Sequence, residues 1–166
     1  VPLILVKKDI TLIKKHIFKL MLISIGSIFL TSGLLISVIF IPVSLVALIF
    51  YTYPLLVLIF SFLLGKKLKL LQICGFILAF IGLGIALGPS FKSFNITGIM
   101  LAFLAAIGAS TVLITNEFLA KHFFPIFINA FVNIICLIFF FFIILLNFEI
   151  DFSFAPIGWT YLFFAS

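Results

Sequence analysis

Charged residues are scarce in this chain of 166 residues, and arginine is missing altogether. Only 8% of the residues are charged, against about a quarter in soluble globular proteins, so there is too little charge to cover a water-exposed surface. Hydrophobic residues make up 66% of the chain, and the mean hydropathy is +1.57. The composition therefore excludes a soluble domain and indicates an integral membrane protein.

No charged residue lies in the middle of a long apolar run. A charge at the bilayer centre costs about 2.5 to 3.5 kcal/mol on insertion scales. The sequence thus lacks an intramembrane carboxylate for a proton relay, a His/Glu metal cluster and a Ser-His-Asp set, and we expect no enzyme, no cofactor and no metal site. Glu117 and His122 come nearest, and we interpret both as groups at the wet, cytoplasmic end of a span.

The chain has only two cysteines, Cys74 and Cys136. Neither has a partner at metal-ligand spacing, so each is interpreted as a small packing residue. The opening "VPLILV" precedes the first lysine cluster, the reverse of the order in a signal peptide. We interpret this opening as the end of a helix that begins outside the present sequence.

Long apolar runs account for most of the chain. Each has about the 20 residues that one helical crossing of the bilayer needs. The sequence predicts an all-α integral membrane protein, a helical bundle of about five complete transmembrane helices with partial helices at both ends. The complete runs are 20–40, 43–64, 70–88, 97–117 and 124–147, and a partial run begins near Pro156.

The lysines lie in short connectors between the apolar runs. By the positive-inside rule, connectors 7–19, 65–69 and 118–124 are cytoplasmic in a multi-pass protein of the inner (plasma) membrane. The net charge of +6 is therefore assigned to topology and to contacts with anionic lipid. The lipid bilayer is the expected partner, and nucleic acid is not.

Two stripes of small residues recur at helical spacing. Small residues let helices approach closely in lipid, so both stripes are assigned to helix packing. The stripes are Gly75, Ala79, Gly82 and Ala86 on one run, and Gly98, Ala102, Ala105 and Ala109 on the next.

The tetrapeptide Tyr51-Thr52-Tyr53-Pro54 interrupts the second complete run near its middle. Pro54 has no N–H, so the carbonyl of Phe50 loses its helical partner and we expect a kink, with Thr52 placed to bond back to Leu48. At 3.6 residues per turn Tyr51 and Tyr53 point about 160° apart. We therefore expect that they do not line the same wall, and that Tyr51 shares its face with Pro54.

Neutral polar residues also form stripes on other runs. Taken singly, such a residue more often makes a bond between helices, worth about 1 kcal/mol or less, than a substrate contact. Their number, together with the mid-span proline, favours a transport path. The stripes are Ser24, Ser27 and Thr31; Thr111 and Thr115, with Ser110 and Asn116 nearby; and Asn129 and Asn133. The candidate substrate-binding residues are Tyr51, Pro54, Thr31, Ser27, Thr111 and Thr115.

The segment "IPVSLVALIFYTYPLLVLIFSFLLGKKLKLLQICGFILAFIGLGIAL" resembles the third-to-fifth helix region of EamA-type transporters in the drug/metabolite transporter superfamily. In that family a proline-bearing helix is followed by a short cytoplasmic turn and a helix with spaced glycines. The next stretch, "NITGIMLAFLAAIGASTVLITNEFLAKHF", is similar to the opening helix of the second repeat. One departure is the turn Gly65-Lys66-Lys67, where the family often has an acidic residue after the glycine.

The resemblance implies a fold of ten helices in two inverted five-helix repeats. Residues 1–92 would be the C-terminal portion of the first repeat, from the end of the second helix to the fifth, and residues 93–166 the N-terminal portion of the second, from the sixth helix to the start of the eighth. The helices missing from this scheme would come from the rest of the chain or from a second subunit.

The resemblance also implies a permease that works by alternating access. Its substrates would be small polar metabolites such as amino acids, or drug-like amphipathic compounds, and export is the expected direction. The alternative is a non-transporting membrane protein: a truncated remnant, a split half or an assembly subunit. An integral-membrane enzyme ranks below both because no ionisable group lies where water is excluded.

Overall fold

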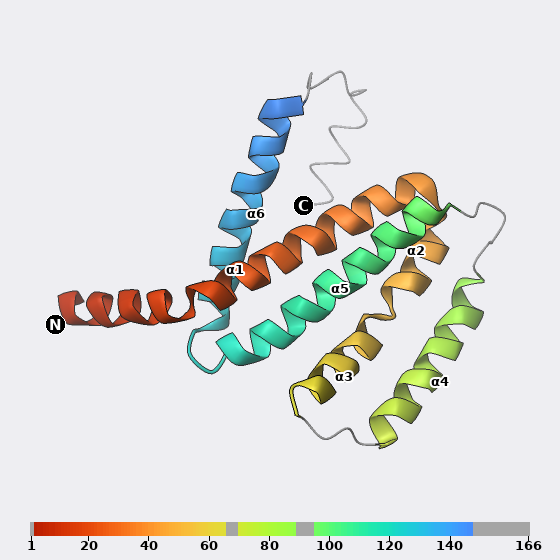
Figure 1. Cartoon of the computed structure of the whole chain (residues 1–166), viewed down its shortest axis with the longest axis horizontal. Helices are drawn as coiled ribbons and strands as arrows, with labels where there is room; N and C mark the ends of the chain where they lie inside the picture. The colour runs from red at the N-terminus through yellow and green to blue at the C-terminus, as the bar shows by residue number, and fades with distance from the viewer. Residues whose placement is uncertain (1, 66–69, 89–94, 148–166) are drawn as a thin grey trace, which may run out of the picture. The chain divides into compact units, whose positions relative to one another are not determined.

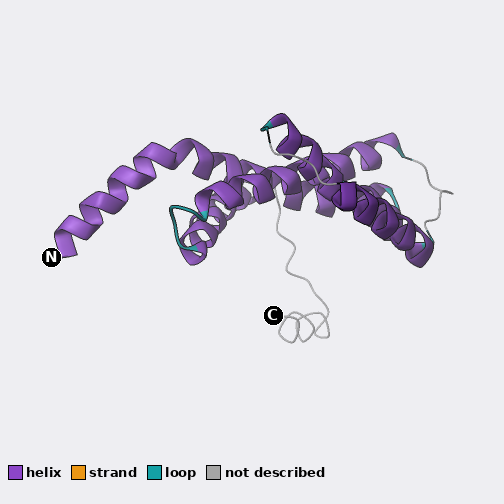
Figure 2. Ribbon diagram, turned by 90° about the horizontal axis from the view of Figure 1, so that it is seen from below, coloured by secondary structure: helices purple, strands orange, loops and turns teal. Residues whose placement is uncertain are grey.

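The computed structural model describes the backbone of residues 2–65, 70–88 and 95–147, with side chains from residue 13 to residue 146 within these ranges. All elements in this part of the chain are α-helices (Figures 1 and 2). They are α1 (Pro2–Phe40), α2 (Val43–Phe50), α3 (Tyr53–Leu63), α4 (Leu70–Leu87), α5 (Ile96–Leu119) and α6 (Pro125–Asn147).

Five helical segments are long and apolar enough to cross a membrane, which confirms the predicted all-α, multi-pass class. They are Ile13–Phe40, Val43–Leu63, Leu70–Leu87, Ile96–Leu119 and Pro125–Leu146. Glycines follow two of them and end the helix, because Gly65 after α3 and Gly88 after α4 adopt positive φ angles of 83° and 48°.

Connector 7–19 is not a loop, contrary to the expectation from its charges. It belongs to α1, which runs without interruption for 39 residues. No proline or glycine lies between residues 3 and 25, and lysine and leucine are good helix formers, so nothing local ends the helix there. At 1.5 Å per residue α1 is about 58 Å long, so it extends beyond a hydrocarbon core of about 30 Å.

Contacts within the chain divide it inside α6, into a unit of residues 1–136 and a unit of residues 137–166. The second unit is described only over the last turns of α6, where the rings of Phe139 and Phe140 meet edge to face at 5.4 Å. The packing and the cavities described below belong to the first unit.

The contact between α1 and α5 is the main packing interface, and the two helices lie side by side (Figure 1). Glycines bring the backbones together: a Cβ atom built on Gly108 would lie 2.6 Å from the Gly26 carbonyl oxygen, and one on Gly33 would lie 2.7 Å from that of Leu101. Gly98, Ala102, Ala105 and Ala109 are all buried, as predicted for a packing stripe, and Ala105 faces Gly33 of α1.

Two clusters of buried apolar side chains complete the packing. One joins α1, α5 and the start of α6, and the other joins the end of α1 to α2 and α5. The first consists of Leu20, Ile23, Leu119 and Ile128, and the second of Ile41, Leu45, Val46 and Ala102.

The stripe on α4 does not pack against another described helix, so that prediction is wrong for this part of the chain. All four residues are exposed, and a Cβ atom on Gly75 or Gly82 would meet nothing within 4 Å. The face of α4 that meets α2 carries Gly84 instead, whose Cβ position is 4.0 Å from Leu48. Cys74, predicted to be a packing residue, is also exposed.

Candidate functional site

The predicted kink is a complete break in the helix. α2 ends at Phe50 and α3 begins at Tyr53, so Pro54 occupies the first turn of α3, where its missing N–H costs nothing. Because residue 54 cannot donate, the carbonyl of Phe50 loses its usual helical partner. The break therefore sets the carbonyl end of one helix beside the N–H end of the next.

Thr52 closes the break locally. Its backbone N–H donates to the carbonyl of Ile49 at 3.1 Å, and its Oγ1 donates to the same oxygen at 2.7 Å. The prediction that the Thr52 hydroxyl bonds to the carbonyl of Leu48 is therefore wrong. The chain tightens at this point from bonds four residues apart to bonds three residues apart, so the carbonyl of Ile49 is the one within reach.

Ser110 of α5 joins the break to the main interface. Its side chain is fully buried, and its Oγ lies 2.7 Å from the carbonyl oxygen of Ala106 and 3.1 Å from that of Tyr53. One hydroxyl proton is thus shared between its own helix and the first residue of α3. Sequence reasoning noted Ser110 only as a neighbour of Thr111, because a serine at this spacing gives no sign of which helix it meets.

The side chains of Tyr51 and Tyr53 lie close together at the break and line a common cavity. The prediction that they point about 160° apart is wrong. Their ring centroids are 6.3 Å apart, and the ring of Phe50 lies 5.8 Å from that of Tyr51 and 5.1 Å from that of Tyr53. A regular rotation of about 100° per residue does not hold across a broken helix. Both tyrosines line a cavity of about 260 Å³, with Leu30 and Val112 among its other walls.

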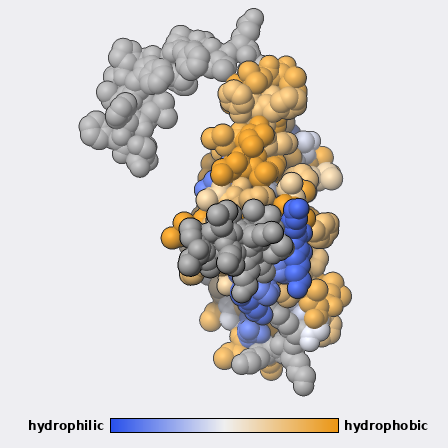
Figure 3. Space-filling model, turned by 90° about the vertical axis from the view of Figure 1, so that its left-hand side faces the viewer, coloured by the Kyte–Doolittle hydropathy of each residue, from blue (hydrophilic) through white to orange (hydrophobic). Residues whose placement is uncertain are grey.

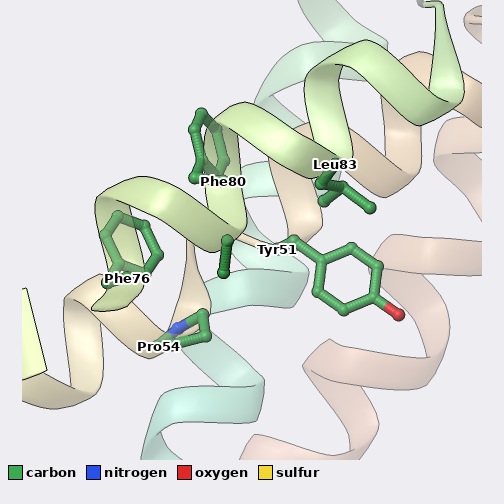
Figure 4. A pocket seen from close by; sticks show the side chains of 6 residues that line it. Tyr51, Pro54, Phe76, Phe80 and Leu83 are labelled. Atoms are coloured by element: carbon green, nitrogen blue, oxygen red, sulfur yellow. The ribbon is translucent and has the colours of Figure 1, made fainter. Parts of the chain in front are cut away.

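A second cavity, of about 290 Å³, lies between the break and α4 (Figure 4). It is mostly apolar, and Tyr51 belongs to it as well as to the first cavity. The Tyr51 side chain is 44% exposed, and its hydroxyl points away from Phe76 and Phe80 in Figure 4. The lining residues are Tyr51, Pro54, Phe76, Ala79, Phe80 and Leu83.

Thr111 and Thr115 line a different cavity of about 330 Å³ between α1, α3 and α5. The hydroxyl of Thr111 donates to the carbonyl of Ile107 at 2.9 Å, and Thr115 is buried. The residues around them are apolar and include Leu22 and Phe60. No lining residue is shared with the cavity beside α4.

Ser27 and Thr31 line none of these three cavities. Thr31 is exposed, and nine residues of helix set it about 180° around α1 from Leu22, which lines the threonine cavity. Ser27 is half-buried. The structure thus places Tyr51 with Pro54 in one cavity and Thr111 with Thr115 in another, and Ser27 and Thr31 line neither.

The sequence model described as the EamA-like transporter family matches residues 1–88, slightly more than half of the chain. The match spans α1 to α4 and includes the broken helix. Neither the curated proteins nor the solved structures gave a match.

Proposed function

The chain belongs to the EamA-like transporter family, and from this premise we propose that it exports small amphipathic molecules, amino acids with apolar side chains among them. The substrate rests at the break between α2 and α3, with its apolar part between Tyr51 and α4. Further transmembrane helices, in the same chain or in a second subunit, are the partner that alternating access requires.

The observation that carries this proposal is the pair of helix ends at the break. Secondary transporters often bind substrates near the middle of the bilayer, where interrupted helices offer backbone polar groups. Here the Phe50 carbonyl at the end of α2 is an acceptor, and the start of α3 at Tyr53 carries the partial positive charge of a helix N-terminus. A zwitterionic head group finds both kinds of partner within one turn of chain.

The cavity beside α4 supports the amphipathic part of the proposal. Its volume of about 290 Å³ is near the lower end of small-molecule sites, and its walls are Phe76, Phe80 and Leu83 opposite one tyrosine. Apolar walls with few polar groups accommodate a hydrocarbon or aromatic side chain. They offer no charged partner to a purely polar solute.

The lysines support a cytoplasmic location for one end of the bundle in the plasma membrane. Connectors 7–19 and 118–124 meet through the stacked rings of His16 and His122, so both belong to the same end. Leu64, which directly precedes connector 65–69, lines one cavity with Leu22 of α1. This contact is consistent with a position of connector 65–69 at the same end of the bundle. This sidedness is expected from the positive-inside rule.

The test is uptake of labelled amino acids and amphipathic compounds into inside-out vesicles that contain the protein. Tyr51→Phe is expected to lower transport more than Tyr53→Phe, because Tyr51 lines both cavities and Tyr53 only one. A neutral hydrogen bond of about 1 kcal/mol corresponds to about a fivefold loss. Tyr53→Phe is the matched control for removal of a hydroxyl.

A second pair of variants tests the apolar wall. Phe76→Leu is expected to change the preference among side chains of different size, whereas Phe62→Leu, at an exposed phenylalanine of α3 outside the cavity, is expected to leave it unchanged. Equal loss of transport in the two tyrosine variants, together with equal substrate preference in the two phenylalanine variants, would contradict the assignment of the site. Absence of uptake for every compound tried would contradict the proposed function itself.

A further inference from the structure

We propose that the end of the bundle where α1 meets the turn after α5 holds the phosphate headgroup of an anionic phospholipid. The site consists of Lys19, Lys121 and the stacked pair of His16 and His122. It lies apart from the break between α2 and α3, so it does not depend on the transport site.

A single aromatic ring positions the two lysines. The Nζ atom of Lys19, on α1, lies 4.8 Å from the centroid of the Phe118 ring, and that of Lys121, after α5, lies 5.8 Å from it. Attraction of a cation to the ring holds each ammonium group near Phe118. Two positive charges, one on α1 and one in the turn after α5, are thereby held at the same ring.

The histidine pair fixes the turn to α1 beside these lysines. The rings of His16 and His122 are stacked at 4.6 Å with an angle of 20°, and Phe123 meets His16 edge to face at 6.0 Å. The turn is also closed by N–H groups of His122 and Phe123 that both donate to the carbonyl of Leu119 at 2.9 Å. Imidazole N–H groups add donors suited to phosphate oxygens.

The surrounding charge is positive. Lys14 and Lys15 are exposed on α1 close to the pair, and Glu117 is the single acidic residue among the described side chains. In the view of Figure 3 hydrophilic side chains lie beside hydrophobic surface. A headgroup with a net negative charge is therefore attracted to this end of the bundle.

The apolar side chains around the site favour a phospholipid over a soluble phosphate. Phe18, which directly precedes Lys19, is 76% exposed, and Phe124, which lines a cavity with Lys121 and His122, is 84% exposed. A cavity of about 250 Å³ is lined by residues 120–125, with Lys121 and His122 among apolar side chains. A soluble phosphate uses the cations only, whereas a phospholipid uses the cations and also covers the exposed rings with its acyl chains.

The experiment measures binding of phosphatidylglycerol to the purified protein in neutral detergent, by the lipid retained in native mass spectrometry and by the shift of the thermal midpoint. We expect phosphatidylglycerol to bind and to raise the midpoint, with phosphatidylcholine and inorganic phosphate much weaker. Equal effects of phosphatidylcholine would overturn the charge argument. Equal effects of inorganic phosphate would show that the acyl chains contribute nothing, and would overturn the assignment to a lipid.

Matched variants locate the site. Lys19→Gln combined with Lys121→Gln should weaken phosphatidylglycerol binding about 30-fold, from the usual contribution of two lysines near an anionic surface. Lys66→Gln combined with Lys67→Gln removes the same charge from connector 65–69 and should have little effect. Phe118→Leu keeps every charge and should weaken binding severalfold, because the ring no longer positions the two ammonium groups. An equal loss in both lysine pairs would mean an unspecific charge effect and would refute the site.

Discussion

Gly108→Ala is expected to disrupt the interface between α1 and α5. The added Cβ atom would lie 2.6 Å from the carbonyl oxygen of Gly26 and 2.7 Å from the backbone nitrogen of Leu30. Ordinary contact begins at 3.4 Å, so the gap is short by 0.8 Å at the first of these atoms. Both obstacles are backbone atoms of α1, and no side-chain rotation relieves the clash.

The cost follows from the separation that the two helices would need. Overpacking a well-packed interior costs about 1 to 3 kcal/mol, and the upper end applies here because the whole of α1 must shift. Helices in lipid associate through close packing of small residues, so the shift also weakens contacts along the rest of the interface. We therefore expect the free energy of unfolding to fall by about 3 kcal/mol.

The assay is equilibrium unfolding in mixed micelles of neutral detergent and sodium dodecyl sulfate, followed by circular dichroism. Gly82→Ala is the matched control, since it also lies inside a transmembrane helix but has nothing within 4 Å of its Cβ position. We expect it to change the free energy by about 0.5 kcal/mol or less. The Cβ atom of Gly33→Ala would lie 2.7 Å from its nearest neighbour, so we expect a loss of stability similar to that of Gly108→Ala. For Gly26→Ala this distance is 3.1 Å, so we expect a smaller loss.

This order is the test of the reasoning. Equal stability of the Gly108 and Gly82 variants would show that the close approach of α1 and α5 does not hold the bundle together. A Gly26 variant less stable than the Gly108 variant would show that the distances in the interface do not determine the cost.

Three further changes probe the break and a helix end. Ser110→Ala removes the hydroxyl that reaches Tyr53 and should cost about 0.6 kcal/mol in the same unfolding assay, with faster hydrogen exchange at the start of α3. Thr52→Val keeps the shape but removes the 2.7 Å bond to Ile49, and should speed exchange at the break without changing exchange in α5. Asn95→Ala removes the side-chain cap of α5 and should lower stability by about 1 kcal/mol, whereas Asn95→Asp should not.

The location of the candidate site was predictable in part. Pro54 marked the break because a proline inside an apolar run has one local consequence, the loss of a helical hydrogen bond. Phe76, Phe80 and Leu83 were missed as cavity residues. In a membrane protein an apolar side chain faces lipid, another helix or a cavity with the same composition, so the sequence carries no sign that separates the three.

The face of a residue was predictable only where a helix is regular. The stripe of Gly98 on α5 packs as expected because α5 is one unbroken helix with α1 beside it. Tyr51 and Tyr53 approach each other because the break resets the rotation of the chain between them. Residues 7–19 were predicted to be a connector but belong to helix α1. The lysines indicate where the membrane ends, and they carry no information on the backbone conformation.

The sequence by itself determined the membrane class, the five spans and the position of the break, because hydropathy and proline act within one segment. Only the tertiary structure decided that both tyrosines share a cavity, that Ser110 bonds to the start of α3, and that Gly75 and Gly82 of α4 contact no described residue at their Cβ positions. These features depend on which helices become neighbours. That choice is made by close packing between segments distant in the chain, and no local pattern encodes it.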